Sequence, residues 1–135
     1  MSFVELPHTA DVRIRVTSVS LEGIFSEAAL AMMGIMYGRT DPGSVERTIT
    51  LESESPEDLL MDFLSEVLFV SEVDGLVFSS FAVTLSGNSL TSRLLGEPFD
   101  PAKHRGGTEI KGVSYSGLRI LKEDDGYVLD ILFDV

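Results

Sequence analysis

Two strand–helix units, 35 residues apart, constrain the fold of this chain more than any other feature. Residues 11–17 alternate apolar and polar side chains, which predicts a half-buried strand. Residues 20–36 place apolar side chains at helical spacing after a serine suited to cap a helix. Residues 45–51 and 55–70 repeat the order, a strand and then a helix that begins Ser-Pro-Glu-Asp.

The two units align with each other residue by residue. Ser20 and Ser55 hold equivalent cap positions, and each is followed two residues later by a glutamate. Apolar positions also correspond, as at Ile14 and Ile49. The alignment indicates either a weak internal duplication or a coincidence between two amphipathic segments.

After Gly75 the chain shows strand patterns without further helices. The expected strands cover 76–85, 89–95, 109–121 and 127–133, and the first two are joined by a tight Ser-Gly-Asn turn. The absence of crossover helices argues against a parallel sheet. We therefore predict a single domain over 1–135 of α+β class. Two helices cover one face of a mainly antiparallel sheet, which is either open or curled toward a barrel.

The formal net charge of -12 restricts the class of partner. Affinity for phosphates comes mainly from Lys and Arg, so strong direct binding to nucleic acid is not expected. Excess acid suits cation binding or docking to a basic protein surface, or it is simply a soluble acidic surface. The chain has no cysteine and two histidines, which excludes disulfides and Cys-based zinc sites.

The sequence favours a cytoplasmic protein without a membrane segment. No apolar run approaches the roughly 20 residues that a membrane helix needs. The first five residues, Met-Ser-Phe-Val-Glu, lack the basic start and apolar core of a signal peptide.

Asp11, Asp134 and Val135 are the candidate metal ligands. Strand alternation places Asp134 on the face opposite Phe133, and Asp11 stands on the polar side of its own strand. The side-chain carboxylates of the two aspartates and the main-chain carboxylate of Val135 are hard oxygen donors, which Ca²⁺ and Mg²⁺ prefer. These residues alone cannot complete a coordination shell, and the alternative is that both aspartates are solvated strand ends.

Three further residues are candidates for contact or activation. Lys111 shares strand phase with apolar residues, so it is either a lysine that extends to solvent or a cation aimed at a phosphate or carboxylate. His8 is either a partly buried, hydrogen-bonded histidine or a general base. His104 lies in a Lys-His-Arg loop and is a candidate contact.

With these residues in view, the chain resembles the archease family over nearly its whole length. The matching segments are Leu-Pro-His-Thr-Ala-Asp at 6–11, Ser-Leu-Glu at 20–22, Asp-Leu-Leu-Met-Asp-Phe-Leu-Ser-Glu at 58–66, Gly-Glu at 96–97, His104, Glu-Ile-Lys-Gly-Val-Ser-Tyr at 109–115 and Phe-Asp-Val at 133–135. The order and spacing of these segments make the resemblance specific.

The resemblance implies an accessory protein of the RtcB-type RNA ligase, which joins RNA ends in tRNA splicing and repair. Archeases promote guanylylation of the ligase and multiple turnover, and they are not ligases themselves. A divalent cation, calcium in the family and replaceable by Mg²⁺ or Mn²⁺, would be held by Asp11, Asp134 and the main chain of Val135. The lysine of the family corresponds to Lys111.

The sequence departs from the family pattern at five positions. Phe63 and Ser65 replace tryptophan and asparagine, and Gly112, Ser114 and Ser116 replace Ala, Thr and His. Only Ser116 removes a polar contact, and none is a proposed metal ligand. Two other functions remain as alternatives: a metal-assisted phosphoester hydrolase using His8 and Asp11, and a chaperone or modulator of RNA-modifying enzymes with a broad apolar surface.

Overall fold

The computed structural model describes residues 11–114 and 118–135. Each expected helix and strand is present within these residues, in the expected order, except the strand expected at 109–121. The elements are β1 (Asp11–Ser18), α1 (Leu21–Tyr37), β2 (Val45–Glu52), α2 (Pro56–Asp74), β3 (Leu76–Ser86), β4 (Ser89–Pro98), β5 (Gly112–Val113), β6 (Arg119–Glu123) and β7 (Gly126–Asp134).

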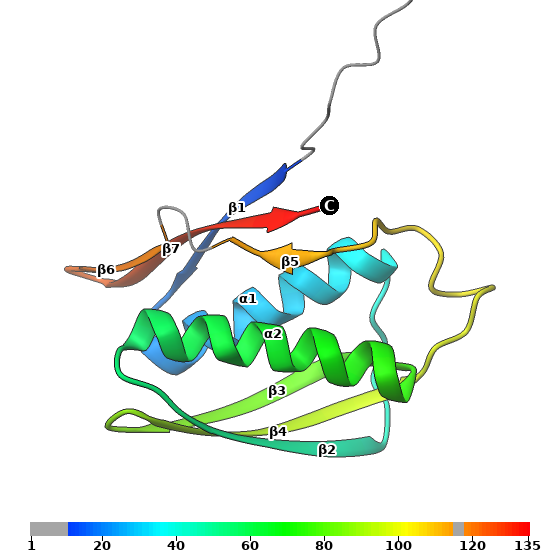
Figure 1. Ribbon diagram of the computed structural model, residues 1–135, viewed down its shortest axis with the longest axis horizontal. Coiled ribbons are helices and arrows are strands. Elements are labelled where there is room, and N and C mark those ends of the chain that lie inside the picture. Colours follow the sequence, from blue (N-terminus) through cyan, green and yellow to red (C-terminus); the bar gives the residue numbers. More distant parts are fainter. Residues whose placement is uncertain (1–10, 115–117) are drawn as a thin grey trace, which may run out of the picture.

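The elements form three layers, with both helices between two antiparallel sheets (Figure 1). Sheet A contains β1, β7, β5 and β6, and sheet B contains β2, β4 and β3. The predicted α+β class is therefore confirmed. The strands do not form the single sheet that the sequence suggested, and neither sheet closes into a barrel. Each sheet instead covers one side of the helix layer, because both helices are apolar on more than one side.

The two strand–helix units hold equivalent places in the structure, as the predicted duplication requires. Sheet A runs β1–β7–β6 and sheet B runs β2–β4–β3, so each has an edge strand beside a hairpin. The caps are also alike. Ser20 Oγ accepts from the Gly23 amide at 3.0 Å, and Ser55 Oγ accepts from the Asp58 amide at 3.1 Å.

The core lies between the layers and joins both units. Phe25 of α1 and Phe63 of α2 contact each other with ring centroids 6.0 Å apart, and both are fully buried. Phe133, near the end of β7, is also fully buried. Since Asp134 follows Phe133 on the opposite face, burial of this phenylalanine directs the aspartate to solvent.

Strand β4 extends three residues beyond the expected range, to Pro98, and two other elements differ more. Helix α2 continues one turn beyond Val70 to Asp74, because the buried Ser71 hydroxyl donates to the Leu76 carbonyl at 2.6 Å and joins the helix end to β3. The expected strand 109–121 is two short strands, β5 and β6, which pair with successive parts of the same edge of β7.

Candidate functional site

Asp11 and Asp134 are directly opposite each other in sheet A. They are register partners at the first position of β1 and the last of β7, and both are exposed. Side chains of directly opposed residues lie on the same face of a sheet, with Cβ atoms about 5 Å apart. The structure thus brings together the two aspartates that the sequence singled out 123 positions apart.

The segment before β5 joins the site from the other side of β7. Gly112 is the register partner of Asp134, and the Lys111 amide donates to the Asp134 carbonyl at 2.7 Å. A Cβ placed on Gly112 would lie 3.8 Å from Oδ2 of Asp134, so this carboxylate leans toward β5. Lys111 itself is exposed. Its main chain is therefore anchored at this end of the sheet while its side chain is exposed.

The donor set suits a hard cation but fills only part of a coordination shell. Two carboxylates face each other, and like charges directly opposite on a sheet are unfavourable unless something compensates them. Among residues 11–114 and 118–135, no group of three or more His, Asp or Glu side chains could hold a metal ion. A cation bound by Asp11 and Asp134 would need further oxygens from the main chain, water or a partner.

His104 lies away from this site and is buried. Its ring packs between Tyr37 and Phe99, with centroids 6.1 and 5.8 Å away. Nδ1 accepts from the Asp100 amide at 2.9 Å, whereas Nε2 is 3.7 Å from a carboxylate oxygen of Glu97 and makes no hydrogen bond within the described residues. A partner could touch His104 only if its loop moved, so the structure gives this residue a role in holding the loop.

Tyr37 connects this cluster to both helices. Its hydroxyl lies 2.6 Å from Oγ of the buried Ser71 in α2, and burial raises the pKa of the tyrosine. The cluster therefore holds the ends of α1 and α2 together. The remaining candidate, His8, lies outside the described residues, as does Ser116.

The outer face of sheet A carries charged residues that the sequence reading did not single out. Arg15 Nε and Nη2 donate to the two carboxylate oxygens of Asp130 at 2.8 and 3.0 Å. The guanidinium group holds the pKa of Asp130 below its usual range, and the hydrogen-bonded carboxylate raises the pKa of Arg15. Strand phase alone could have placed both residues on this face, but not opposite each other.

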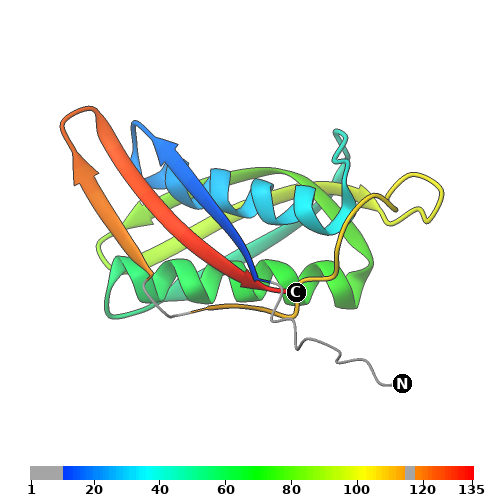
Figure 2. The same ribbon diagram turned by 90° about the horizontal axis from the view of Figure 1, so that it is seen from above.

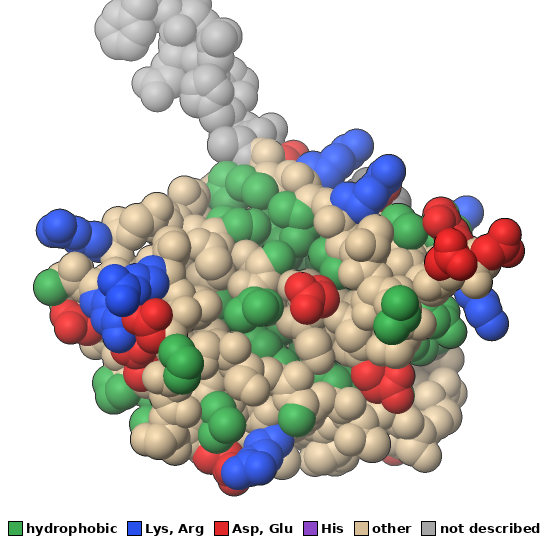
Figure 3. Space-filling model, turned by 180° about the vertical axis from the view of Figure 1, so that it is seen from behind, with side chains coloured by type: hydrophobic (Ala, Val, Ile, Leu, Met, Phe, Trp, Pro, Cys, Tyr) green, Lys and Arg blue, Asp and Glu red, His purple; other side chains and the backbone are tan. Residues whose placement is uncertain are grey.

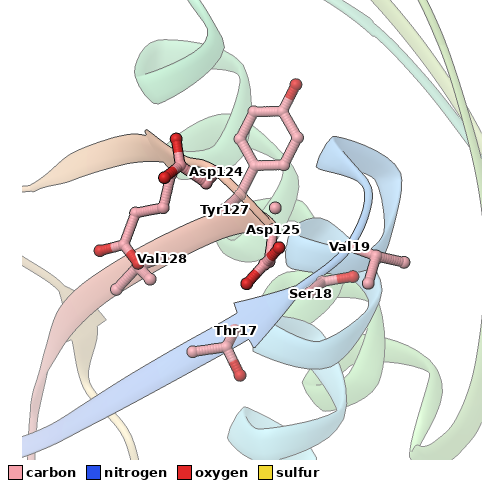
Figure 4. A pocket seen from close by; sticks show the side chains of 9 residues that line it. Thr17, Ser18, Val19, Asp124, Asp125, Tyr127 and Val128 are labelled. Carbon is pink, nitrogen blue, oxygen red and sulfur yellow. The ribbon is translucent and has the colours of Figure 1, made fainter.

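A hollow of about 780 Å³ lies at the far end of β1 and β7 (Figure 4). Asp124, Asp125 and Tyr127 line one part of it, and Ser18 and Val19 line the other. Seven residues of strand separate it from the Asp11–Asp134 pair, or about 24 Å. Its carboxylates belong to an exposed turn, so the hollow is separate from the candidate metal site.

Known proteins match this chain over nearly its whole length. Residues 3–135 match the Archease protein family. A protein archease of Methanosarcina barkeri is 38% identical, covering 96% of this chain and 93% of that protein. A protein archease-like of Drosophila melanogaster is 33% identical, covering 100% of this chain and 91% of that protein.

Two solved structures share the fold. The solution structure of Methanobacterium thermoautotrophicum protein 1598 superposes with a TM-score of 0.80 at 29% identity, covering 96% of both chains. The crystal structure of a Thermotoga maritima protein described as "an archease, possible chaperone" gives a TM-score of 0.71 at 21% identity, covering both chains fully. In the part of the chain described here, neither helix is long and apolar enough to cross a membrane.

Proposed function

We propose, from the premise that this chain belongs to the archease family, that it is an accessory protein which activates an RtcB-type RNA ligase. In this role it promotes guanylylation of the ligase and its multiple turnover in tRNA splicing and RNA repair. Family membership supports an accessory role in general. The ligase as partner and the dependence on a metal are the parts that experiment must test.

The observation that carries the proposal is the pairing of Asp11 with Asp134 beside Lys111. Two carboxylates face each other on an exposed end of sheet A, and the main chain of the exposed Lys111 is hydrogen-bonded to Asp134 there. Within the described residues they are not buried in an enclosed catalytic cavity. An exposed, incomplete site of this kind suits a group that is presented to another protein, whose own donors complete it.

Asp11 and Asp134 would hold the cation, with the main chain of Val135 as a third donor, and Lys111 would contact a phosphate. When bound, a divalent cation such as Ca²⁺, Mg²⁺ or Mn²⁺ stabilises negative charge on phosphate oxygens. The residues of this chain contribute position, because β1, β5 and β7 are joined by main-chain hydrogen bonds around the aspartates. Their rigidity would orient the donors before the ligase docks.

The test is guanylylation of the RNA ligase from the same organism, measured with and without this protein and with and without a chelator. We expect wild-type protein to accelerate guanylylation, and the chelator or Asp11→Ala to abolish the acceleration. Asp124→Ala is the matched control, because it removes an equally acidic side chain from the distant turn. Equal stimulation by wild-type protein and Asp11→Ala would contradict the proposal.

A chaperone role is the second candidate, since the Thermotoga maritima relative is described as a possible chaperone. On the face that α1 forms, hydrophobic side chains gather near the centre around one acidic side chain, and most other charged side chains lie toward the rim (Figure 3). Among described residues, however, the large hydrophobic side chains that are most exposed do not form one patch, and only Phe69 and Val73 share an element, helix α2. The full set is Val19, Phe69, Val73, Phe99 and Leu121. A broad client-binding surface is therefore less well supported than a specific partner.

A further inference from the structure

The outer face of sheet A is an open surface at the upper side of the molecule. Both helices pack against its inner face, and no helix crosses in front of β1, β7 and β6 when the sheet is viewed from outside (Figure 2). The outward side chains follow from the register. Arg13 lies opposite Leu132, and Asp130 lies between Arg15 and Arg119. This face begins at the Asp11–Asp134 pair and continues away from it.

Basic residues are concentrated on this sheet although the chain is acidic. Five of the ten Lys and Arg residues lie in sheet A or directly before β5. Of the five basic residues elsewhere, Arg39, Arg47, Arg93 and Lys103 each form an ion pair with a carboxylate, and Arg105 forms none with a described residue. Among the five of sheet A, Arg15 alone forms an ion pair with a described residue.

The other basic residues of sheet A form no ion pair in the described part of the chain, although the charge of Arg13 contributes to lowering the pKa of Asp130. No carboxylate within residues 11–114 and 118–135 lies at ion-pair distance from Arg13, Lys111, Arg119 or Lys122. Both carboxylate oxygens of Asp130 accept hydrogen bonds from the guanidinium group of Arg15. In a chain with 22 acidic and 10 basic residues, partners for these cations would be abundant. Of the carboxylates near these arginines, Asp130 is bound by Arg15, and Asp11 and Asp134 are the candidate cation ligands. Arg13 and Arg119 are therefore left to meet an external anion.

The spacing of the two exposed arginines suits an extended anion. Arg13 and Arg119 stand on opposite sides of β7, two strands apart and one outward position apart along the sheet. Standard strand geometry separates their Cα atoms by about 12 Å. Side chains of both can therefore reach different charges of one polyanion. The aspartate pair with Lys111 lies one outward position beyond Arg13, about 7 Å along the strand.

We infer that this face binds one strand of RNA through its phosphates, with Arg13 and Arg119 as the principal contacts. The inference rests on the proposed function, in which the ligase supplies the RNA. Planar guanidinium forks match phosphate oxygens in pairs. Leu121, Val128 and Leu132 offer apolar contact on the same face. None of the described residues on this face offers an aromatic ring for base stacking, so we expect phosphate contacts rather than base contacts to dominate.

The net charge decides when this contact is effective. At -12, the isolated chain repels a polyanion, and two or three arginines cannot overcome that repulsion. Once the protein is held on its ligase, the RNA is already local and a few phosphate contacts are enough to align it. The arginine face therefore orients RNA relative to the neighbouring aspartate site rather than capturing RNA from solution.

The experiment uses the complete protein with its ligase and a single-stranded RNA substrate. The double variant Arg13→Gln, Arg119→Gln is compared with the matched control Arg93→Gln, Arg105→Gln, which removes the same charge from sheet B and the exposed 99–111 loop. Three quantities are measured: the KM for RNA in stimulated ligation, the rate of guanylylation, and the affinity for the ligase.

We expect the sheet A variant to raise the KM for RNA about 3- to 20-fold, as loss of two exposed charge contacts implies. For this variant, the slope of log KM against log salt concentration should be smaller by about 1.4 than for the wild type. Guanylylation and affinity for the ligase should match those of the control. An unchanged KM overturns the inference, as does an equal loss of affinity for the ligase, which would assign the face to an acidic protein surface. If wild-type protein fails to stimulate the ligase at all, the proposed function fails and this inference with it.

Discussion

Replacing Asp134 by asparagine should remove function while leaving the fold equally stable or slightly more stable. Asn keeps the size of the side chain and the main-chain bond from Lys111 to the residue 134 carbonyl. It removes one of two negative charges that face each other across β1 and β7. Most substitutions in a functional protein destabilise it, so this combination is an unusual signature.

The size of the expected change in Tm follows from the exposed position of Asp11 and Asp134. Opposed like charges on a sheet cost about 0.2–1 kcal/mol, and solvent screening at this exposed edge puts Asp11 and Asp134 at the low end. An unfolding entropy of about 2.1 cal/mol/K per residue gives roughly 0.28 kcal/mol/K for 135 residues. Without a divalent cation, Asp134→Asn should therefore raise Tm by about 1–2 °C.

Calcium should reverse the order of stability. A cation present at 100 times its Kd stabilises the folded wild type by about 2.7 kcal/mol, which corresponds to roughly 10 °C in Tm. Loss of one carboxylate that weakens the Kd at least tenfold would remove about 1.4 kcal/mol of this gain, or about 5 °C. The variant should then be less stable than wild type in calcium and no longer stimulate the ligase.

Differential scanning calorimetry with calcium and with chelator measures both effects on the same samples. Asp124→Asn is the control, because its carboxylate belongs to the turn at the opposite end of β7 and should respond to calcium as wild type does. The reasoning is refuted if Asp134→Asn loses more than about 1 kcal/mol in chelator. It is also refuted if calcium raises the Tm of variant and wild type equally.

Two further predictions concern stability alone. Ser71→Ala should lower the free energy of unfolding by about 2 kcal/mol, because it leaves the buried Leu76 carbonyl and the Tyr37 hydroxyl without their shared partner. Urea unfolding measures this change, and a loss below about 0.5 kcal/mol would contradict the prediction. Arg15 lowers the folded-state pKa of Asp130, so their ion pair stabilises the protein above the unfolded pKa of about 3.9 and this contribution is lost as pH falls through the lower folded value. The Tm difference between wild type and Asp130→Asn should thus shrink as pH falls from about 5 to 2, and a constant difference would refute the assignment.

Local pattern determined much of the secondary structure and the direction of its side chains. Period-two alternation in 11–17 and 127–133 identified the inner and outer faces of β1 and β7, because a strand directs successive side chains to opposite sides. Ser20 and Ser55 marked both helix starts through a capping bond that depends only on residues three positions apart. These features involve near neighbours in the chain, so the sequence alone is sufficient to predict them.

The tertiary structure decided which strands pair and therefore what the site contains. Nothing local distinguishes one sheet from two, and the division arises because both helices need apolar cover on opposite sides. The burial of His104 depends in part on the ring of Tyr37, which comes from α1 and is 67 positions away in the chain. Residue types and a family resemblance suggested that Asp11 and Asp134 belong together, but only the register of β1 on β7 sets them face to face. The same register places Arg119 opposite Asp130, but Arg15 binds that carboxylate from the other side, so Arg13 and Arg119 form no ion pair within the described residues.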